Sequence, residues 1–266
     1  MTQVVTVERG DGPLVLGMPH VGTWLPPEIL ADLNDRGRGL DDTDWHIERL
    51  YAGLLPAATV VRAGFHRYGI DANRDPTGES LYPGQNTTGL VPLTDFDANP
   101  IWTRAPDSAE IERRRQLFHA PYHAALAAEM HRVRDRHGVA ILYDCHSIRS
   151  HIPFLFNGKL PDLNVGTAHG TTCAPEIEAA AMQAVGGTDH VLNGRFVGGW
   201  TTRHWGRPAE GFHAIQMELA QSTHLVSETQ PFAYDPAKAA KLRPVLKDLL
   251  EAIAGLAPAL AKGRAQ

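Results

Sequence analysis

Residues 141–147 read ILYDCHS, an apolar run that changes abruptly to polar side chains. The apolar part predicts a buried β-strand, and in an α/β protein ligands and metals are held beyond the carboxyl ends of strands. Because side chains alternate along a strand, Asp144 and His146 should share one face while Tyr143 and Cys145 share the other. Taken alone, the stretch predicts either a core strand with a polar end or one wall of a site.

A second short apolar run also ends in a histidine. Residues 14–18 are followed by Pro19 and His20, and this proline and Gly22 stop the strand and fix the loop behind it. Two strands would therefore each deliver a histidine to a strand end. This arrangement makes His20 and His146 candidate metal ligands, because imidazole nitrogen is a common ligand of zinc.

The composition is that of an ordinary globular protein. The 266 residues are close to the upper limit for one hydrophobic core, which predicts a single domain spanning 1–266. A net charge of −5 argues against nucleic acid as the main partner. The sequence has no run of about 18 apolar residues and no signal-peptide core, which predicts no membrane association. Two cysteines are too few for a disulfide framework and predict a cytoplasmic protein.

Acidic residues cluster at 41–44, ahead of a helix predicted over 45–55. Carboxylates favour a helix N-terminus through capping and the helix dipole, so the cluster could be a cap. Carboxylates at the end of an element are equally what a metal site requires. Both interpretations stay open for Asp44.

A loop at 71–76 carries Asn73 and Arg74 directly before an Asp-Pro turn. An arginine held in such a loop suits bidentate capture of a carboxylate. The alternative is an ion pair with Asp71 or Asp75. The next residues, 77–106, are rich in Gly, Pro, Thr and Asn and predict a long ordered loop of the kind that forms lids or binding loops.

The rest of the chain divides into short strands and longer helical stretches. Pro121 should break or kink the helical stretch that begins near residue 107, whose arginines at 113–115 are expected on its solvated face. Strands are expected at 59–62, 164–167 and 214–220, and helices at 107–137, 175–185 and 236–260.

Glu218 lies on the polar face of the strand expected at 214–220, whose other face is apolar. A carboxylate is costly to bury without a partner. It could pair with an arginine in the core or, with a raised pKa, act as a general base. Gly198 and Gly199 allow close approach to a ligand, and the nearby Arg203 is a second candidate for binding an anionic group.

These residues together fit the chemistry of a zinc hydrolase. Such enzymes hold zinc through three protein ligands and leave one position for a water, whose pKa falls to about 7 on the metal. A carboxylate outside the ligand set takes the proton of that water, and arginines orient the substrate through its carboxylates. The sequence offers two strand-end histidines, nearby acids, a strand glutamate and two loop arginines.

Six short segments carry a resemblance to a known family. They are PHVGT at 19–23, TDWH at 43–46, DANRDP at 71–76, YDCHSIRS at 143–150, GGWTTRH at 198–204 and QMEL at 216–219. In this order they resemble the N-formylglutamate amidohydrolase (deformylase) family, and the similarity covers a core of about 5–255. The resemblance implies hydrolysis of N-formyl-L-glutamate, a small dicarboxylate, to L-glutamate and formate in bacterial histidine degradation.

The same segments are more distantly similar to zinc carboxypeptidases. That similarity implies an α/β fold of the phosphorylase/hydrolase-like kind, in which helices flank both faces of a mixed, twisted eight-stranded sheet. It also implies that His146 is a zinc ligand, that Asn73 and Arg74 bind a carboxylate, and that Glu218 is the general base.

His20 resembles the first ligand of the carboxypeptidase His-x-x-Glu motif, but Thr23 stands where the glutamate belongs. The third ligand must therefore come from another position. Asp44 is preferred over His46 and Glu48.

The leading hypothesis is a zinc-dependent deformylase, with another divalent metal as a variant of it. A related amidohydrolase or carboxypeptidase acting on another N-acyl amino acid is the first alternative. A cysteine hydrolase built on Cys145 and His146 has poor geometry, because these two residues are neighbours in a strand and face opposite ways. A histidine-rich metal-binding protein would leave Glu218 without a role. The leading hypothesis gives each candidate residue a role. His20, Asp44 and His146 hold the metal, and Glu218 is the general base. Asn73, Arg74 and Arg203 bind the substrate carboxylates, and Asp144 orients His146.

Overall fold

Strand β4 (Ala140–Ile148) lies at the centre of the sheet in the computed structural model, which describes residues 3–79 and 86–263. Every residue of β4 is buried. It pairs in parallel with β2 (Leu14–Met18) on one side and with β7 (Phe212–Ala220) on the other. The three strands predicted at these places are therefore confirmed.

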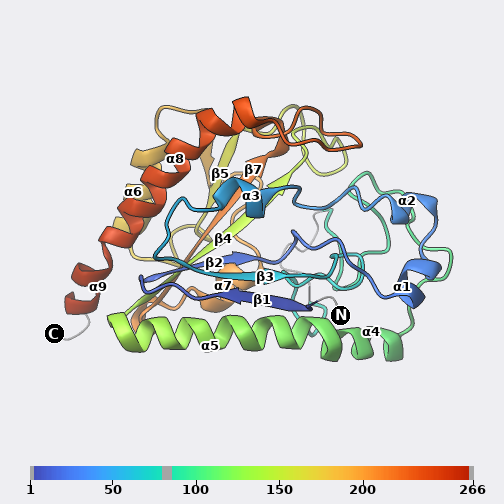
Figure 1. Ribbon diagram of the computed structural model, residues 1–266, viewed down its shortest axis with the longest axis horizontal. Coiled ribbons are helices and arrows are strands. Elements are labelled where there is room, and N and C mark those ends of the chain that lie inside the picture. Colours follow the sequence, from blue (N-terminus) through green and yellow to red (C-terminus); the bar gives the residue numbers. More distant parts are fainter. Residues whose placement is uncertain (1–2, 80–85, 264–266) are drawn as a thin grey trace.

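The sheet of the described residues has seven strands in the order β1-β3-β2-β4-β7-β5-β6, one fewer than the distant resemblance implies (Figure 1). The four neighbours β3, β2, β4 and β7 are parallel, so their carboxyl ends meet at one edge. Antiparallel pairing of β1 with β3 and of β5 with β7 makes the sheet mixed. The outer strands are β1 (Val5–Glu8), β3 (Thr59–Ala63), β5 (Leu163–Gly166) and β6 (His190–Leu192).

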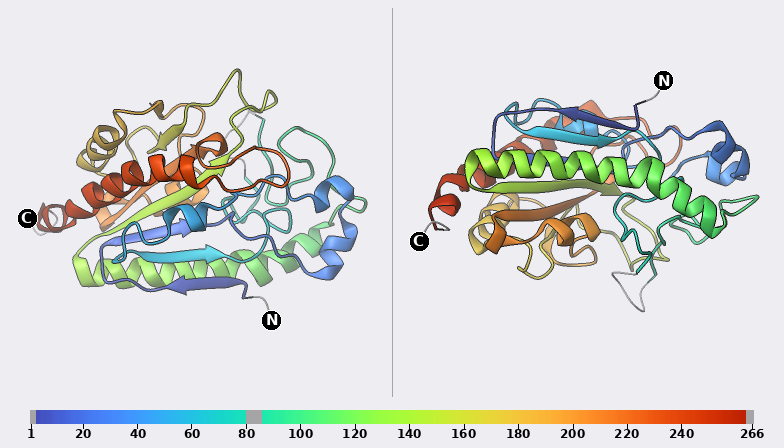
Figure 2. Two further views of the ribbon diagram at one scale, coloured as in Figure 1. Left: turned by 45° about the horizontal axis from the view of Figure 1, so that its top comes forward. Right: turned by 90° about the horizontal axis from the view of Figure 1, so that it is seen from below.

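Helices cover both faces of the sheet, as expected (Figure 2). One face contacts α5 (Ala120–His137), which runs across β1 to β4. The other contacts α3 (Ile47–Tyr51) and α6 (Pro175–Val185), and both of these helices pack on α8 (Pro236–Gly255). The remaining helices are α1 (Pro27–Asp32), α2 (Asp35–Arg38), α4 (Ser108–Arg114), α7 (Trp200–Trp205) and α9 (Ala257–Gly263), with 3₁₀ turns at Pro208–Glu210 and Gln221–Thr223.

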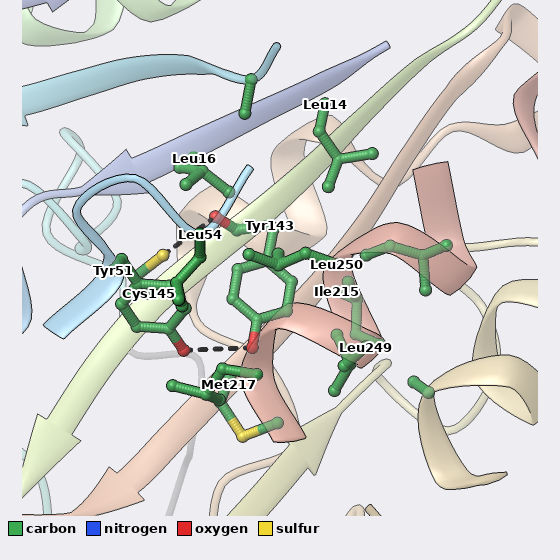
Figure 3. Packing of buried hydrophobic residues seen from close by; sticks show 14 of the residues in the cluster. Leu14, Leu16, Tyr51, Leu54, Tyr143, Cys145, Ile215, Met217, Leu249 and Leu250 are labelled. Carbon is green, nitrogen blue, oxygen red and sulfur yellow. Dashed lines mark hydrogen bonds between the residues drawn. The ribbon is translucent and has the colours of Figure 1, made fainter. Parts of the chain in front are cut away.

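The side chains of β4 alternate between two hydrophobic clusters, as the period of a strand requires. Tyr143 and Cys145 lie in the cluster shared with α3 and α8, where the Tyr143 hydroxyl is 3.1 Å from that of Tyr51 (Figure 3). Leu142 packs in the opposite cluster, against α5. The predicted alternation is confirmed, and it leaves His146 on the face away from Cys145.

Two helix predictions are wrong in their details. The helix expected at 45–55 is the single turn of α3, and His46 precedes it with a φ of 61° and no side-chain cap. The capping interpretation of the acidic cluster is therefore wrong. The closing helix expected at 236–260 ends at Gly255 and continues as α9.

The helical stretch from residue 107 is interrupted near Pro121, as predicted. A π-helical turn, Arg115–His119, joins α4 to α5. The solvated arginine face is wrong for Arg114, which is buried. Its guanidinium pairs with Glu110, donates to the Gly69 carbonyl and lies over the Trp102 ring, and these contacts satisfy its charge.

Candidate active site

His20, Asp44 and His146 come together beyond the carboxyl ends of β2 and β4. Each of the three residues offers a ligand atom, and these atoms all lie within 4.8 Å of one another. Asp44 Oδ2 is 3.2 Å from His146 Nδ1 and 3.7 Å from His20 Nδ1. Ligands 2.0–2.2 Å from a tetrahedral zinc would be roughly 3.4 Å apart, so the carboxylate is spaced from both rings as a shared metal requires.

The backbone explains how Asp44 reaches the two histidines. The Asp44 N–H donates to the carbonyl of His20, which ties the acidic loop to the end of β2. Asp44 Oδ2 in turn accepts from the backbone N–H of Ser147 on β4. The loop is therefore fixed at both strand ends, with its carboxylate between the two imidazoles.

Each histidine also has a carboxylate behind its ring. His20 Nε2 lies 2.7 Å from Asp71 Oδ1, and His146 Nε2 lies 3.1 Å from Asp144 Oδ1. A proton on His20 Nε2, donated to Asp71, leaves His20 Nδ1 as a bare lone pair on the side of Asp44, the carboxylate–histidine arrangement of metal sites. His20 Nδ1 is buried and has no hydrogen-bond partner. This orphaned acceptor is what a bound cation would satisfy, and the donor set suits zinc.

The electrostatics of the cluster keep its carboxylates ionised. Burial alone would raise the pKa of Asp44, but the hydrogen bond with His146 and the nearby His20 ring outweigh burial and hold the pKa below its usual value. Burial likewise opposes ionisation of Asp71, and the Arg67 guanidinium 2.7 Å away holds its pKa well below the usual range. Ionised carboxylates favour binding of a cation.

Glu218 lies beside the cluster on β7, directly opposite His146 in the parallel pairing. It is buried, and its Oε2 accepts from the side chain of Gln216 at 3.0 Å. Burial raises the pKa of Glu218 to about 8 against the opposing charge of His146, and the Asp44 carboxylate adds to the rise. A carboxylate with such a pKa can take up and return a proton near neutral pH.

A pocket of about 600 Å³ opens over this cluster. Its lining includes His20, His146 and Glu218, together with Asn73 and Arg74. Five of the candidate residues named from the sequence therefore line one pocket.

Asn73 connects the loop at 71–76 to the cluster. Its Nδ2 lies 3.1 Å from His146 Nε2, and its Oδ1 accepts from the N–H of Thr201. A Cβ at Gly199 would lie 2.3 Å from Asn73 Nδ2, so only glycine allows this approach. The close approach expected of the paired glycines is real, but it is made to a protein side chain.

The arginines are arranged differently from the expectation. Arg203 is not among the described lining residues, and its Nε donates to the carbonyl of Gly198 at 3.0 Å. Arg67 and Arg195 line the pocket instead, alongside Arg74. Arg74 also lies 3.7 Å from Asp71, so the expected ion pair and the pocket position coexist.

Arg67 and Arg195 are pocket residues that the sequence patterns did not predict. Arg67 belongs to the FHRYG stretch, just before the loop at 71–76, and this proximity is a signal that could have identified it. Arg195 donates to the carbonyls of Leu155 and Asn86, both far away in the chain. No local pattern marks such a position.

The competing ligands and the cysteine lie elsewhere. His46 Nε2 contacts the carbonyl of Phe232, and Glu48 lines a separate hollow beside α3. Cys145 is buried in the core opposite the pocket, and burial raises the pKa of its thiol well above the usual value. A buried, protonated thiol is a poor nucleophile, which excludes the cysteine-hydrolase alternative.

An α/β sheet with a His–Asp–His cluster and a buried glutamate at its carboxyl edge has the arrangement of a metal-dependent hydrolase. The sequence profile of the N-formylglutamate amidohydrolases matches residues 12–225. The chain belongs to this family. An N-formylglutamate deformylase of Pseudomonas aeruginosa is 45% identical over 260 residues, which cover 95% of this chain and 97% of that protein. One of Pseudomonas putida is also 45% identical, over 95% of this chain and 96% of its own length.

Solved structures agree with the fold. The crystal structure of an N-formylglutamate amidohydrolase from Ralstonia eutropha superimposes with a TM-score of 0.77 at 27% identity, covering 97% of this chain and 98% of that one. A gene product of Agrobacterium tumefaciens matches with a TM-score of 0.71 at 16% identity, covering 96% of each chain, and supports the fold alone. No helix of the described residues combines the length and apolar character that crossing a membrane requires.

Proposed function

We propose that the protein is an N-formylglutamate deformylase that hydrolyses N-formyl-L-glutamate to L-glutamate and formate. The observation that carries the proposal is the His20–Asp44–His146 cluster, whose two histidines line one pocket together with Glu218. The likeness to the two Pseudomonas deformylases supports the choice of substrate.

His20, Asp44 and His146 would hold a zinc ion, to which their two nitrogens and one oxygen are well suited. Bound zinc supplies Lewis acidity and lowers the pKa of a water in the site. Asp71 accepts the Nε2 proton of His20 and so keeps the Nδ1 of that ring available to the metal. Asp144 lies 3.1 Å from His146 Nε2 and is placed to orient that ring.

Glu218 acts as the general base. Its carboxylate takes a proton from the attacking water, whose oxygen bonds to the formyl carbon. The same carboxyl then returns the proton to the amide nitrogen as the C–N bond breaks, which releases formate and the amine of glutamate. The raised pKa of Glu218 suits both transfers, and Gln216 fixes the orientation of the carboxylate.

Arg74 and Arg195 bind the two carboxylates of the substrate in this proposal. Both line the pocket and carry the positive charge that a dicarboxylate requires. Arg195 is proposed in addition to the arginines expected from the sequence because it lines the pocket, whereas Arg203 is not among the described lining residues. Arg67 is buried against Asp71 and Asp44, and it balances the charge of those carboxylates.

The test is formate release from N-formylglutamate, N-formylaspartate and N-formylmethionine, each with and without a metal chelator. We expect chelator-sensitive release that is fastest with N-formylglutamate. A preference for N-formylmethionine would contradict the dicarboxylate pocket. Bound metal without release from any of the three would favour a metal-binding protein instead.

A further inference from the structure

Two histidines outside the described pocket lining hold the loop that carries Asn73 and Arg74. His119 Nε2 lies 3.0 Å from the carbonyl oxygen of Arg74, and His123 Nε2 lies 2.7 Å from that of Ala72. The two accepting carbonyls flank Asn73. A carbonyl only accepts, so each ring donates and must carry its proton on Nε2.

The surroundings of both rings favour their neutral form. His119 is buried, and His123 Nδ1 is buried without a hydrogen-bond partner, which is the environment of an unprotonated nitrogen. Burial lowers the pKa of His123 to about 3 and also lowers the pKa of His119 from its usual value. Both imidazoles therefore act as fixed donors.

Helix geometry directs both histidines toward the same loop. They are four residues apart, a spacing that places two side chains on one helix face. His119 ends the π turn Arg115–His119, in which the Ala120 N–H bonds to the Arg115 carbonyl. Such a turn adds one residue to the helix and shifts the face presented downstream, and π turns are frequent at functional sites.

Trp200 joins these histidines to the opposite side of the loop. Its ring centroid lies 4.7 Å from that of His123 and 5.7 Å from that of His119. Trp200 begins α7 directly after Gly199, the residue that Asn73 closely approaches. The π turn and α5 therefore contact α7 through the rings of His119, His123 and Trp200, beside the loop at 71–76.

The loop depends on such contacts because it has no strand or helix of its own between residues 71 and 76. We infer that His119 and His123 are positioning residues, which fix the peptide units on both sides of Asn73 and so aim Arg74 into the pocket. The inference rests on the proposed function in one respect, namely that Arg74 binds a substrate carboxylate.

Matched variants separate the donated proton from the packing of the ring. His123→Phe and His119→Phe keep an aromatic ring beside Trp200 but have no donor, whereas His123→Gln and His119→Gln keep an N–H near the position of Nε2. An unsatisfied buried carbonyl costs enough to predict a rise of about tenfold in the KM of N-formylglutamate for each Phe variant. We expect a much smaller change in kcat, unchanged metal content, and recovery of KM in the Gln variants. Equal losses in Phe and Gln variants would overturn the inference.

A double-mutant cycle shows whether the histidine acts through Arg74. In the background of Arg74→Met, His123→Phe should raise KM little further, because the side chain that it positions is already absent. A full, multiplicative increase would overturn the inference. If the wild type releases no formate from N-formylglutamate, it is the proposed function that fails.

A second measurement requires neither turnover nor a folded Phe variant. Long-range ¹H–¹⁵N spectra of the wild-type protein at neutral pH report the tautomer of each ring, with the Gln variants providing the assignments. We expect neutral Nε2–H tautomers for His119 and His123. An imidazolium or an Nδ1–H tautomer at either residue would overturn the inference.

Discussion

The two faces of β4 bury polar atoms in different ways. On one face the Tyr143 and Tyr51 hydroxyls bond to each other within an apolar cluster, and Cys145 packs beside them (Figure 3). On the other face His146 lies close to the carboxylates of Asp144 and Asp44 and to the imidazole of His20. The Nδ1 of His20 has no hydrogen-bond partner. A satisfied buried group serves stability, whereas an unsatisfied one among charges marks a site that binds something.

The largest expected difference between the two faces is seen when adjacent residues of β4, His146 and Cys145, are each replaced by alanine. His146→Ala removes a proposed ligand, so we expect loss of bound metal and no formate release above background. Cys145→Ala changes only the core face and should keep the metal and the activity. Metal analysis and formate assays of the two variants test the difference. A stoichiometric metal in His146→Ala would contradict the ligand assignment.

A second pair tests the base on β7. Glu218→Gln should keep the metal but lose roughly 100- to 10,000-fold in kcat, because the amide cannot take a proton. Met217→Leu, on the apolar face, is the matched control and should keep kcat. An active Glu218→Gln enzyme would reduce Glu218 to a structural residue.

A third pair sharpens the role of the carboxylate behind His20. Asp71→Asn should weaken metal affinity by about 10- to 100-fold, since a neutral amide orients and polarises the ring less well. Asp75→Asn, in the same loop but more exposed, should leave the affinity unchanged. Competition with a chromophoric chelator measures both constants, and equal affinities for the two variants would argue against a role of Asp71 in metal binding.

The smallest expected effect on activity belongs to the apolar face. Tyr143→Phe leaves the buried Tyr51 hydroxyl without its partner, which should lower the free energy of unfolding by about 1–3 kcal/mol. The kcat of the folded enzyme should not change. Urea denaturation and the formate assay measure the two quantities, and a large fall in kcat would mean that the two faces are not independent.

Much of the fold and site could be predicted because the signals are local. Alternation along 141–147 assigned His146 and Cys145 to opposite faces, and the strand ends identified His20. Alternation along 214–220 made Glu218 a candidate base, the turn at 71–76 made Arg74 a candidate carboxylate binder, and the resemblance assigned the roles of these two residues and of Asn73. Asp44 lies in an acidic cluster ahead of a predicted helix, and it is the preferred third ligand because Thr23 stands where the carboxypeptidase glutamate belongs.

The remainder depends on contacts between distant parts of the chain. Arg195 is held at the pocket by hydrogen bonds to the carbonyls of Leu155 and Asn86, which lie in two other loops. Arg203 donates to the carbonyl of Gly198 in the turn before α7. Arg114 can be buried because the Gly69 carbonyl accepts a hydrogen bond from its guanidinium and the Trp102 ring packs against it. Periodicity along one segment carries no information about contacts with residues far away in the chain.

The central claim is that one face of β4 supplies a metal site together with β2 and the acidic loop. Anomalous diffraction at the zinc absorption edge from crystals of the zinc-loaded protein tests it most directly. The account predicts a single strong peak bounded by His20, Asp44 and His146, with Glu218 beside it but outside the ligand set. A peak at another place, or one bound by Glu218 in place of Asp44, would contradict it.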